Sequence, residues 1–221
     1  MNKRVMTRDG SPSLESERWG CAFHSRHGAL TEAMHVYIHH GLAYAATRHP
    51  GTLHLLEMGA GTGFNAALAA EWAHKNARKL IYTGVDLALP QADEWEAWKM
   101  GWSHRPAWMT RAEGLRAAWT RGEPYQDEWV HARFQMGEAP LVSLPSEVHC
   151  VFYDAFSPSQ QPELWTAEAL GPWLKALHTK GCLVTYCARG HVFRAIQTLG
   201  YAVEHVPGPP GKREMLRATV A

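Results

Sequence analysis

Residues 53–65 read LHLLEMGAGTGFN: a short apolar run ends at the acid Glu57 and passes into glycines at positions 59, 61 and 63. An alanine-rich stretch follows from residue 66 to 77. The order is therefore a strand, a tight loop and a helix whose N-terminus points back over the strand. Glycine supplies the positive φ angles and the close backbone approach that such a loop needs. The N–H groups of the loop and the helix dipole favour a polar or anionic ligand.

The spacing of the glycines indicates which class of ligand the loop binds. A dinucleotide fingerprint reads G-x-G-x-x-G, whereas this loop reads Glu57-x-Gly59-x-Gly61-x-Gly63, with one residue in every gap. The spacing resembles motif I of the class I S-adenosyl-L-methionine (SAM) methyltransferases, where the loop passes the methionine end of the cofactor. The resemblance makes these four residues candidate SAM ligands. The alternative is a glycine-rich turn of another α/β protein, and the spacing disfavours an NAD enzyme.

Composition excludes several classes of protein. The 221 residues are 46% hydrophobic and 19% charged, as in a folded globular chain. The formal net charge is +1, so contact with a nucleic acid would depend on a local basic face. No apolar run approaches the ~20 residues of a membrane span, and no signal-peptide core begins the chain, so we expect a cytoplasmic protein. The four cysteines form no C-x-x-C pair, and fourteen histidines make chance clusters common, so we predict thiols and no metal.

The remaining apolar runs complete a sheet. Strands are expected at 80–85, 131–136, 148–153 and 182–187, with a closing antiparallel pair at 201–206 and 213–219. With the strand at 53–58, this pattern predicts a Rossmann-like α/β class I methyltransferase fold with a seven-stranded, mostly parallel sheet. We expect one domain over residues 1–221.

Two segments extend that domain. Residues 1–50 form an N-terminal extension, with a hairpin signal at Asp9-Gly10 and a helix expected over 31–42 that Thr31 can cap. Residues 88–130 form a helical insertion after the second strand, which contains six of the ten tryptophans. Tryptophans at helical spacing usually pack in a core, and the alternative is a platform for stacked bases.

Acids follow three of the strands. Ligands of open parallel sheets bind at the carboxyl ends of the strands, beside the point where the strand order reverses. Asp86 is placed to accept hydrogen bonds from ribose hydroxyls, or alternatively to cap a helix. Glu138 occupies the position of the acid that commonly contacts the adenine amino group in SAM enzymes, with a solvated loop acid as the alternative. Asp154 should bind the cofactor and face its transferable methyl group.

Longer motifs make a more specific resemblance. They are residues 23–29 (FHSRHGA) with Glu32, residues 154–158 (DAFSP) followed by 162–165 (PELW), and residues 208–216 (GPPGKREML). Together they resemble the methyltransferase half of the bifunctional tRNA 5-methylaminomethyl-2-thiouridine biosynthesis proteins (MnmC) and their stand-alone form (MnmD). Two positions depart from that family: Asp86 stands where Glu is frequent, and Gln161 where Asn is usual.

The resemblance implies an activity and its partners. Family members methylate the amine of 5-aminomethyl-(2-thio)uridine at the wobble position, in the anticodon stem-loop of tRNA. In the bifunctional form a flavin oxidase domain uncovers that amine. We expect no oxidase chemistry in this chain, and a separate upstream enzyme that supplies the aminomethyl group.

Methylation of an amine needs a proton acceptor. An alkylamine has a pKa near ~10, so it is mostly protonated and non-nucleophilic at neutral pH. Asp154 is the best-placed base or orienting group, with a purely cofactor-binding or capping role as the alternative. Glu32 is a candidate second ligand of the amine, or else a surface acid. Phe156 and Trp165 are candidates for a wall around the base, or else ordinary core residues.

A basic group near the C-terminus completes the prediction. Arg189, Lys212 and Arg213 are candidates for contact with tRNA phosphates, which bind cations without reading sequence. The rival interpretations are a SAM methyltransferase of a small amine or a protein, and a non-catalytic SAM- or RNA-binding module. The full set of acids at the strand ends argues against the module.

Overall fold

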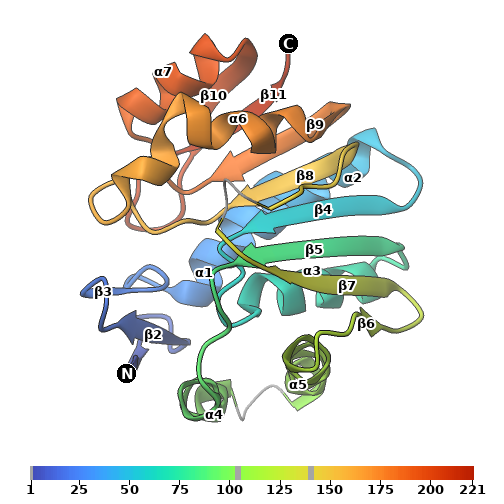
Figure 1. Cartoon of the computed structure of the whole chain (residues 1–221), viewed down its shortest axis with the longest axis vertical. Helices are drawn as coiled ribbons and strands as arrows, with labels where there is room; N and C mark the ends of the chain where they lie inside the picture. The colour runs from blue at the N-terminus through green and yellow to red at the C-terminus, as the bar shows by residue number, and fades with distance from the viewer. Residues whose placement is uncertain (1, 103–105, 139–141) are drawn as a thin grey trace.

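The computed structural model describes residues 2–102, 106–138 and 142–221. Its main sheet has eight strands in the order β10-β11-β9-β8-β4-β5-β7-β6 (Figure 1). Five of them are parallel: β4 (Leu53–Met58), β5 (Leu80–Asp86), β7 (Val130–Met136), β8 (Val148–Tyr153) and β9 (Leu177–Thr185). Three are antiparallel to their neighbours: β6 (Tyr125–Gln126), β10 (Tyr201–Pro207) and β11 (Glu214–Val220). The seven predicted strands are present, and the two-residue strand β6 adds an eighth at one edge.

Helices cover both faces of this sheet. One face carries α1 (Ala29–Ala33), η1 (Met34–Ala43), α2 (Tyr44–Arg48), α3 (Phe64–Lys75), α4 (Ala92–Lys99), η2 (Met100–Trp102) and α5 (Pro106–Thr120). The other carries η3 (Pro162–Trp165), α6 (Ala167–Lys175) and α7 (Gly190–Thr198). Side chains of β8 alternate between the two cores: Cys150 and Phe152 enter the first, Val151 and Tyr153 the second.

Strand β9 begins earlier than its sequence predicts. The sequence pattern predicts that this strand begins at residue 182, but α6 ends at Lys175 and β9 already begins at Leu177. The polar segment 178–181 has no strand-like pattern of its own. It becomes a strand because Leu177 pairs with Val148, and an irregularity in the register follows before Cys150 pairs with Cys182.

The N-terminal hairpin is confirmed and belongs to a small sheet of its own. Its three antiparallel strands are β1 (Lys3–Met6), β2 (Pro12–Ser16) and β3 (Cys21–Ala22). The register pairs Met6 with Pro12, so the Asp9-Gly10 turn lies between β1 and β2. Figure 1 shows this sheet beside α1, in front of the edge where β4 and β5 end.

That hairpin also caps the first helix. The helix begins at Ala29, so the expectation that Thr31 caps it is wrong. The backbone N–H groups of residues 29–31 donate instead to the side chains of Thr7, Ser11 and Asp9, at 3.2, 3.0 and 2.9 Å respectively. Burial raises the pKa of Asp9, but hydrogen bonds from Ser11, Thr7 and Thr31 hold it well below its ordinary value. These bonds fasten the hairpin to the helical run that leads into η1.

The tryptophans of the insertion pack against the core. Five of them are at most 5% exposed: Trp95, Trp98, Trp102, Trp108 and Trp119. Three surround Phe64 at the start of α3, with ring centroids 5.3 to 6.0 Å away. The predicted packing role is confirmed for these residues. Because α3 begins directly after the glycine loop, the cluster also fixes the direction in which that loop leaves the sheet.

Four histidines lie together at the opposite edge of the sheet, where the parallel strands begin. The ring of His149 lies 4.0 Å from that of His49 and 5.4 Å from that of His54, and His178 completes the group. Ring nitrogens of His49, His149 and His178 lie within 4.8 Å of one another. Backbone N–H groups donate to Nδ1 of His149 and of His178, which leaves the proton of each neutral ring on Nε2. These bonds disfavour metal binding by Nε2 of His149 and His178, whereas Nε2 of His49 is buried without a hydrogen-bond partner among the described residues. The absence of a metal stays a prediction.

We expect His24 and His149 to destabilise the fold as the pH falls from 6.5 to 4. Burial lowers the pKa of His24 to about 4, and burial with three neighbouring histidines lowers that of His149 to about 4. In this interval the unfolded chain binds protons at these two residues that the folded chain does not bind. The shift at His24 corresponds to roughly 2–3 kcal/mol, and the more exposed His149 adds less. The raised pKa values of Glu57 and Asp154 act in the opposite direction, so the test compares variants. Urea unfolding at pH 7.5, 6, 5 and 4.5 should show His149→Gln gaining stability relative to the wild type as the pH falls. A difference between the two proteins that does not change with pH would contradict this account.

Among the described residues, no helix is both long and apolar enough to cross a bilayer.

Candidate active site

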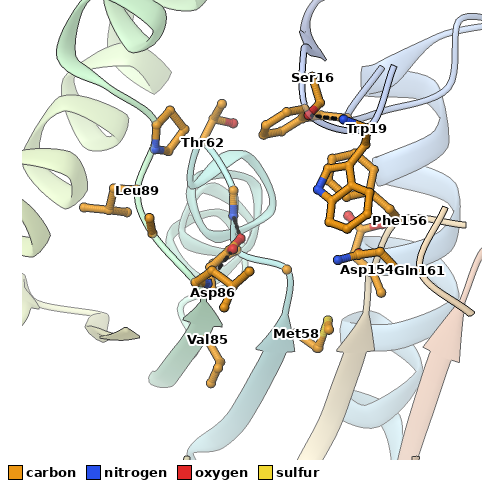
Figure 2. Close-up of a pocket in the computed structure, with 18 of the residues that line it drawn as sticks. Ser16, Trp19, Met58, Thr62, Val85, Asp86, Leu89, Asp154, Phe156 and Gln161 are labelled. Carbon is orange, nitrogen blue, oxygen red and sulfur yellow. Dashed lines mark hydrogen bonds between the residues drawn. The ribbon is translucent and has the colours of Figure 1, made fainter. Parts of the chain in front are cut away.

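A cavity of about 580 Å³ opens at the carboxyl ends of β4, β5 and β8, where the strand order reverses. Figure 2 shows its two ends. One is lined by Thr62, Val85, Asp86 and Leu89, and the other by Trp19, Asp154, Phe156 and Gln161; Met58 lies between them. Its size is typical of a site for a small-molecule ligand. The predicted position of the ligand site, at the glycine loop and beside Asp154, agrees with this cavity.

The glycine loop needs its glycines for steric reasons. Gly59 has φ 84°, and a Cβ there would lie 3.0 Å from the Asp154 carbonyl carbon and closer still to its oxygen. Gly63 has φ 78° in the left-handed region at the start of α3, where a Cβ would meet the Trp119 ring at 3.1 Å. Any larger residue would push the loop away from β8 or from the tryptophan cluster.

Asp86 fastens the same loop from β5. Its carboxylate accepts hydrogen bonds from the N–H groups of Gly61, at 2.8 Å, and Leu87, at 2.7 Å. Burial raises the pKa of this carboxyl, and the backbone hydrogen bonds oppose that rise. The carboxylate keeps a lone pair for a ligand hydroxyl, so the predicted contact with ribose is compatible with the geometry. Glu138 is exposed and lies at the rim of the cavity, and its contact with adenine stays a prediction.

Glu57 lies beneath the loop, away from the cavity wall. It is fully buried and accepts hydrogen bonds from Asn65 Nδ2, at 2.7 Å, and from the Tyr82 hydroxyl. Burial raises its pKa to about 8, against the lowering effect of those two bonds. Its geometry therefore supports the loop through Asn65 and Tyr82. The predicted contact with the cofactor stays a prediction.

Asn65 joins the two sides of the site, and the sequence analysis did not select it. Its Nδ2 donates to Glu57 and, at 3.0 Å, to Asp154 Oδ2. Its Oδ1 and the Thr62 hydroxyl are buried without a hydrogen-bond partner among the described residues, and both residues line the cavity. A ligand with its own donors and acceptors would complete them, as the amino and carboxylate groups of a bound amino-acid moiety would. The residue lies two positions after Gly63, but no motif marked its amide.

Asp154 is held at both oxygens. The Tyr37 hydroxyl donates to Oδ1 at 2.5 Å, and Asn65 donates to Oδ2. Burial raises the pKa of Asp154 to about 7, and the charge of Glu32 acts in the same direction; the hydrogen bonds from Tyr37 and Asn65 lower it. Near neutral pH this carboxyl therefore exchanges a proton readily, as a general base must. Tyr37 lies in η1, whose ten residues form a π-helix, a wide turn frequent at functional sites.

The predicted Glu32 and Lys212 are paired with each other. Lys212 Nζ lies 2.5 Å from Glu32 Oε2 and 4.0 Å from the centre of the Tyr186 ring. The Glu32 side chain is buried, and its other oxygen accepts a hydrogen bond from the Ser25 N–H. Lys212 is thus turned inward, behind Asp154. Its predicted contact with phosphate would require it to leave this pair.

The two predicted arginines point outward. Arg189 is exposed at the N-terminus of α7, and Arg213 is exposed in the β10–β11 connection. Both lie at the carboxyl edge of the parallel strands, because Thr185 at the end of β9 pairs with Leu216 near the start of β11. They share that edge with the cavity, so they are placed to meet a large ligand that enters it.

The two predicted wall residues differ in position. Phe156 lines the cavity, with Trp19 and Phe23 packed against it at ring-centroid distances of 6.2 and 5.3 Å. Trp165 is 1% exposed, lies off the cavity wall, and donates from Nε1 to the Phe156 carbonyl at 2.8 Å. Trp165 is therefore placed to support Phe156 from behind. Trp19 and Phe23 come from the N-terminal segment; Phe23 begins the 23–29 motif, but the sequence analysis assigned neither residue to the site.

This strand order, with a glycine loop after β4, an acid at the end of β5 and a cavity between them, defines a class I SAM-dependent methyltransferase. The profile of the S-adenosyl-L-methionine-dependent methyltransferases matches residues 108–221, and the chain belongs to that family. SAM is its cofactor, and the unpartnered Thr62 and Asn65 atoms fit the amino-acid part of such a ligand.

Named relatives extend the comparison. The chain is 29% identical over 231 residues to the tRNA 5-methylaminomethyl-2-thiouridine biosynthesis bifunctional protein MnmC of Burkholderia mallei (strain SAVP1). The B. pseudomallei (strain 668) protein of the same name matches equally well. Each alignment covers 96% of this chain and 34% of the relative, so the chain spans about a third of the length of these proteins. The crystal structure of MNMC2 from Aquifex aeolicus matches all of this chain and 70% of its own, with a TM-score of 0.77 at 24% identity, and it confirms the fold.

Proposed function

We propose that this chain transfers a methyl group from SAM to the amine of 5-aminomethyl-(2-thio)uridine at the wobble position of tRNA. The observation that carries the proposal is Asp154, a half-buried carboxyl that lines the cavity beside the glycine loop, is held by Tyr37 and Asn65, and has its pKa raised to about 7. An ammonium acceptor needs such a group, because its nitrogen must lose a proton before it can attack the methyl carbon. The names of the matching relatives support a tRNA uridine as the carrier of that amine.

The cofactor supplies a methyl group on a positively charged sulfur. Asp154 accepts one proton from the substrate ammonium and so frees the nitrogen lone pair for attack on the methyl carbon. Tyr37 and Asn65 hold both carboxylate oxygens, so the acceptor does not rotate away. The new N–CH3 bond forms as the C–S bond breaks, the sulfur keeps that electron pair as a neutral thioether, and positioning supplies much of the rate.

The remaining assignments complete the proposal. Arg189 and Arg213 contact phosphates of the anticodon stem-loop, and Glu32 with Lys212 sets the charge behind Asp154. A separate enzyme supplies the aminomethyl group, no metal takes part, and the reaction takes place in the cytoplasm. One observation favours a small amine or a protein as a second candidate substrate. Because Lys212 is paired inside, the outward basic face is smaller than the sequence predicts.

Labelled SAM and two tRNA pools test the proposal. One pool comes from cells that lack this gene, and the other from cells in which the wobble-uridine pathway is blocked upstream. Label should enter the first pool alone and be recovered as 5-methylaminomethyl-uridine or its 2-thio form. Tight SAM binding without label in either pool would exclude tRNA and leave the small amine or protein.

A further inference from the structure

Gln161 is a mostly buried residue whose side-chain amide has no hydrogen-bond partner among the described residues. Its residue is 8% exposed and lines the cavity next to Asp154 (Figure 2). The backbone fixes it: its N–H donates to the Ser157 carbonyl at 2.9 Å, and its own carbonyl accepts from the Leu164 N–H at 3.2 Å. Within the described part of the chain, no hydrogen bond engages the side-chain amide. The side-chain amide reaches the open cavity, so it can hydrogen-bond to a ligand that enters there.

Aromatic rings flank this amide. Trp19 is half-buried in the turn between β2 and β3, where its N–H donates to Ser16 Oγ at 3.2 Å and the Gly20 N–H donates to the Ser16 carbonyl at 2.8 Å. The Arg18 guanidinium lies 4.9 Å from the centre of the indole ring. Phe156 packs on the inner side of this indole, and Figure 2 shows both rings beside Asp154 and Gln161. Half-buried rings that line a cavity are suited to stack on a flat ligand.

We infer that Trp19, Phe156 and Gln161 form a pyrimidine subsite beside Asp154, in which the rings pack against the base and the amide binds its polar edge. The inference rests on the proposed function and names the residues that would hold its substrate. Trp19 and Phe156 are 6.2 Å apart and tilted by 42°, so they touch each other and leave no slot between them. The base therefore stacks on the side of this pair that lines the cavity.

The hydrogen-bonding groups on the edge of uracil match those of the Gln161 side chain. Uracil presents the O4 acceptor beside the N3–H donor, and a primary amide presents a donor and an acceptor in one plane, so the two can form paired hydrogen bonds. The C5 substituent is next to C4, so this contact brings the aminomethyl group to the side of the base that faces Asp154. A wobble base can reach the subsite only after it leaves the stack of the anticodon loop, as single-stranded RNA bases do on aromatic side chains.

The test uses an anticodon stem-loop with 5-aminomethyluridine at the wobble position and 2-aminopurine in the next position. Trp19→Ala should lower kcat/KM about tenfold to a hundredfold, and Trp19→Phe should restore most of it. Gln161→Glu loses the hydrogen-bond donor, so its kcat/KM should be at least about tenfold lower than that of the wild type. The kcat/KM of Gln161→Asn should lie between the two. The Kd for SAM should stay within about threefold in all of them. Trp129→Ala, at the opposite edge of the sheet, is the matched control and should leave kcat/KM unchanged.

The fluorescence of 2-aminopurine tests the subsite independently of turnover. The 2-aminopurine signal should rise when the wild-type protein draws out its neighbour, and Trp19→Ala should abolish the rise. No rise with the wild-type protein, or wild-type kcat/KM in both Trp19→Ala and Gln161→Glu, overturns the subsite. A rise without methyl transfer overturns the proposed reaction and leaves the subsite standing.

Discussion

Asp154→Asn should lower kcat of methyl transfer by about two to four orders of magnitude at pH 7, with the Kd for SAM changed by no more than a few-fold. The substitution is nearly isosteric, and Asn65 and Tyr37 can still hydrogen-bond to the new side chain. What it removes is the group that accepts the proton from the amine. Single-turnover transfer from labelled SAM to an aminomethyluridine RNA measures the effect.

The pH profile separates this role from a structural one. The active form of Asp154 is deprotonated, so kcat/KM of the wild type should rise with pH through about 7 and then level off. Asp154→Asn should lose that limb. Tyr37→Phe removes a hydrogen bond that lowers the pKa, so the limb should move to higher pH while turnover persists. Near-normal turnover in Asp154→Asn excludes the proton-accepting role, and loss of SAM binding together with turnover indicates a cofactor-binding one.

Gly59→Ala should weaken SAM binding by at least about a hundredfold, and is expected to cost a few kcal/mol of folding stability as well. The backbone at Gly59 has a positive φ, and the new Cβ would overlap the Asp154 main chain. That main chain has no room to retreat, because the Asp154 N–H donates to the Met58 carbonyl at 3.0 Å. Calorimetric titration with SAM and urea unfolding report the two effects separately.

A second glycine provides the control. Gly51 precedes β4 in an exposed loop, and a Cβ there would meet no atom within 4 Å. Gly51→Ala should therefore bind SAM and unfold as the wild type does. If Gly59→Ala also retained wild-type affinity, the close packing of the loop on the end of β8 would be wrong.

Local patterns made most of the sheet and the general location of the site predictable. The apolar run before the glycine loop and the acid after β5 depend on neighbouring residues, and their positions followed from spacing. The burial of Glu57 beneath the loop could not be predicted from spacing. Strand β4 is buried on both faces, so its sequence does not show which side chains reach the cavity.

Contacts between distant segments were not predictable in the same way. Tyr37 and Asp154 are 117 residues apart, and the Lys212–Glu32 pair spans 180. The helix start was misplaced for the same reason, since the capping groups come from a hairpin 19 to 22 residues earlier. A pattern within one segment contains no information about which other segment will complete it.

The hairpin that caps α1 has a consequence for how such an enzyme changes its acceptor. Trp19, Glu32 and Tyr37 all precede residue 50, whereas the glycine loop and Asp86 lie between residues 53 and 90. The proposed acceptor side therefore comes from two separate stretches of the chain, one before residue 50 and one that contains Asp154, Phe156 and Gln161, and the donor loop lies between them. A change of acceptor would have to alter both stretches together and could leave the glycine loop as it is.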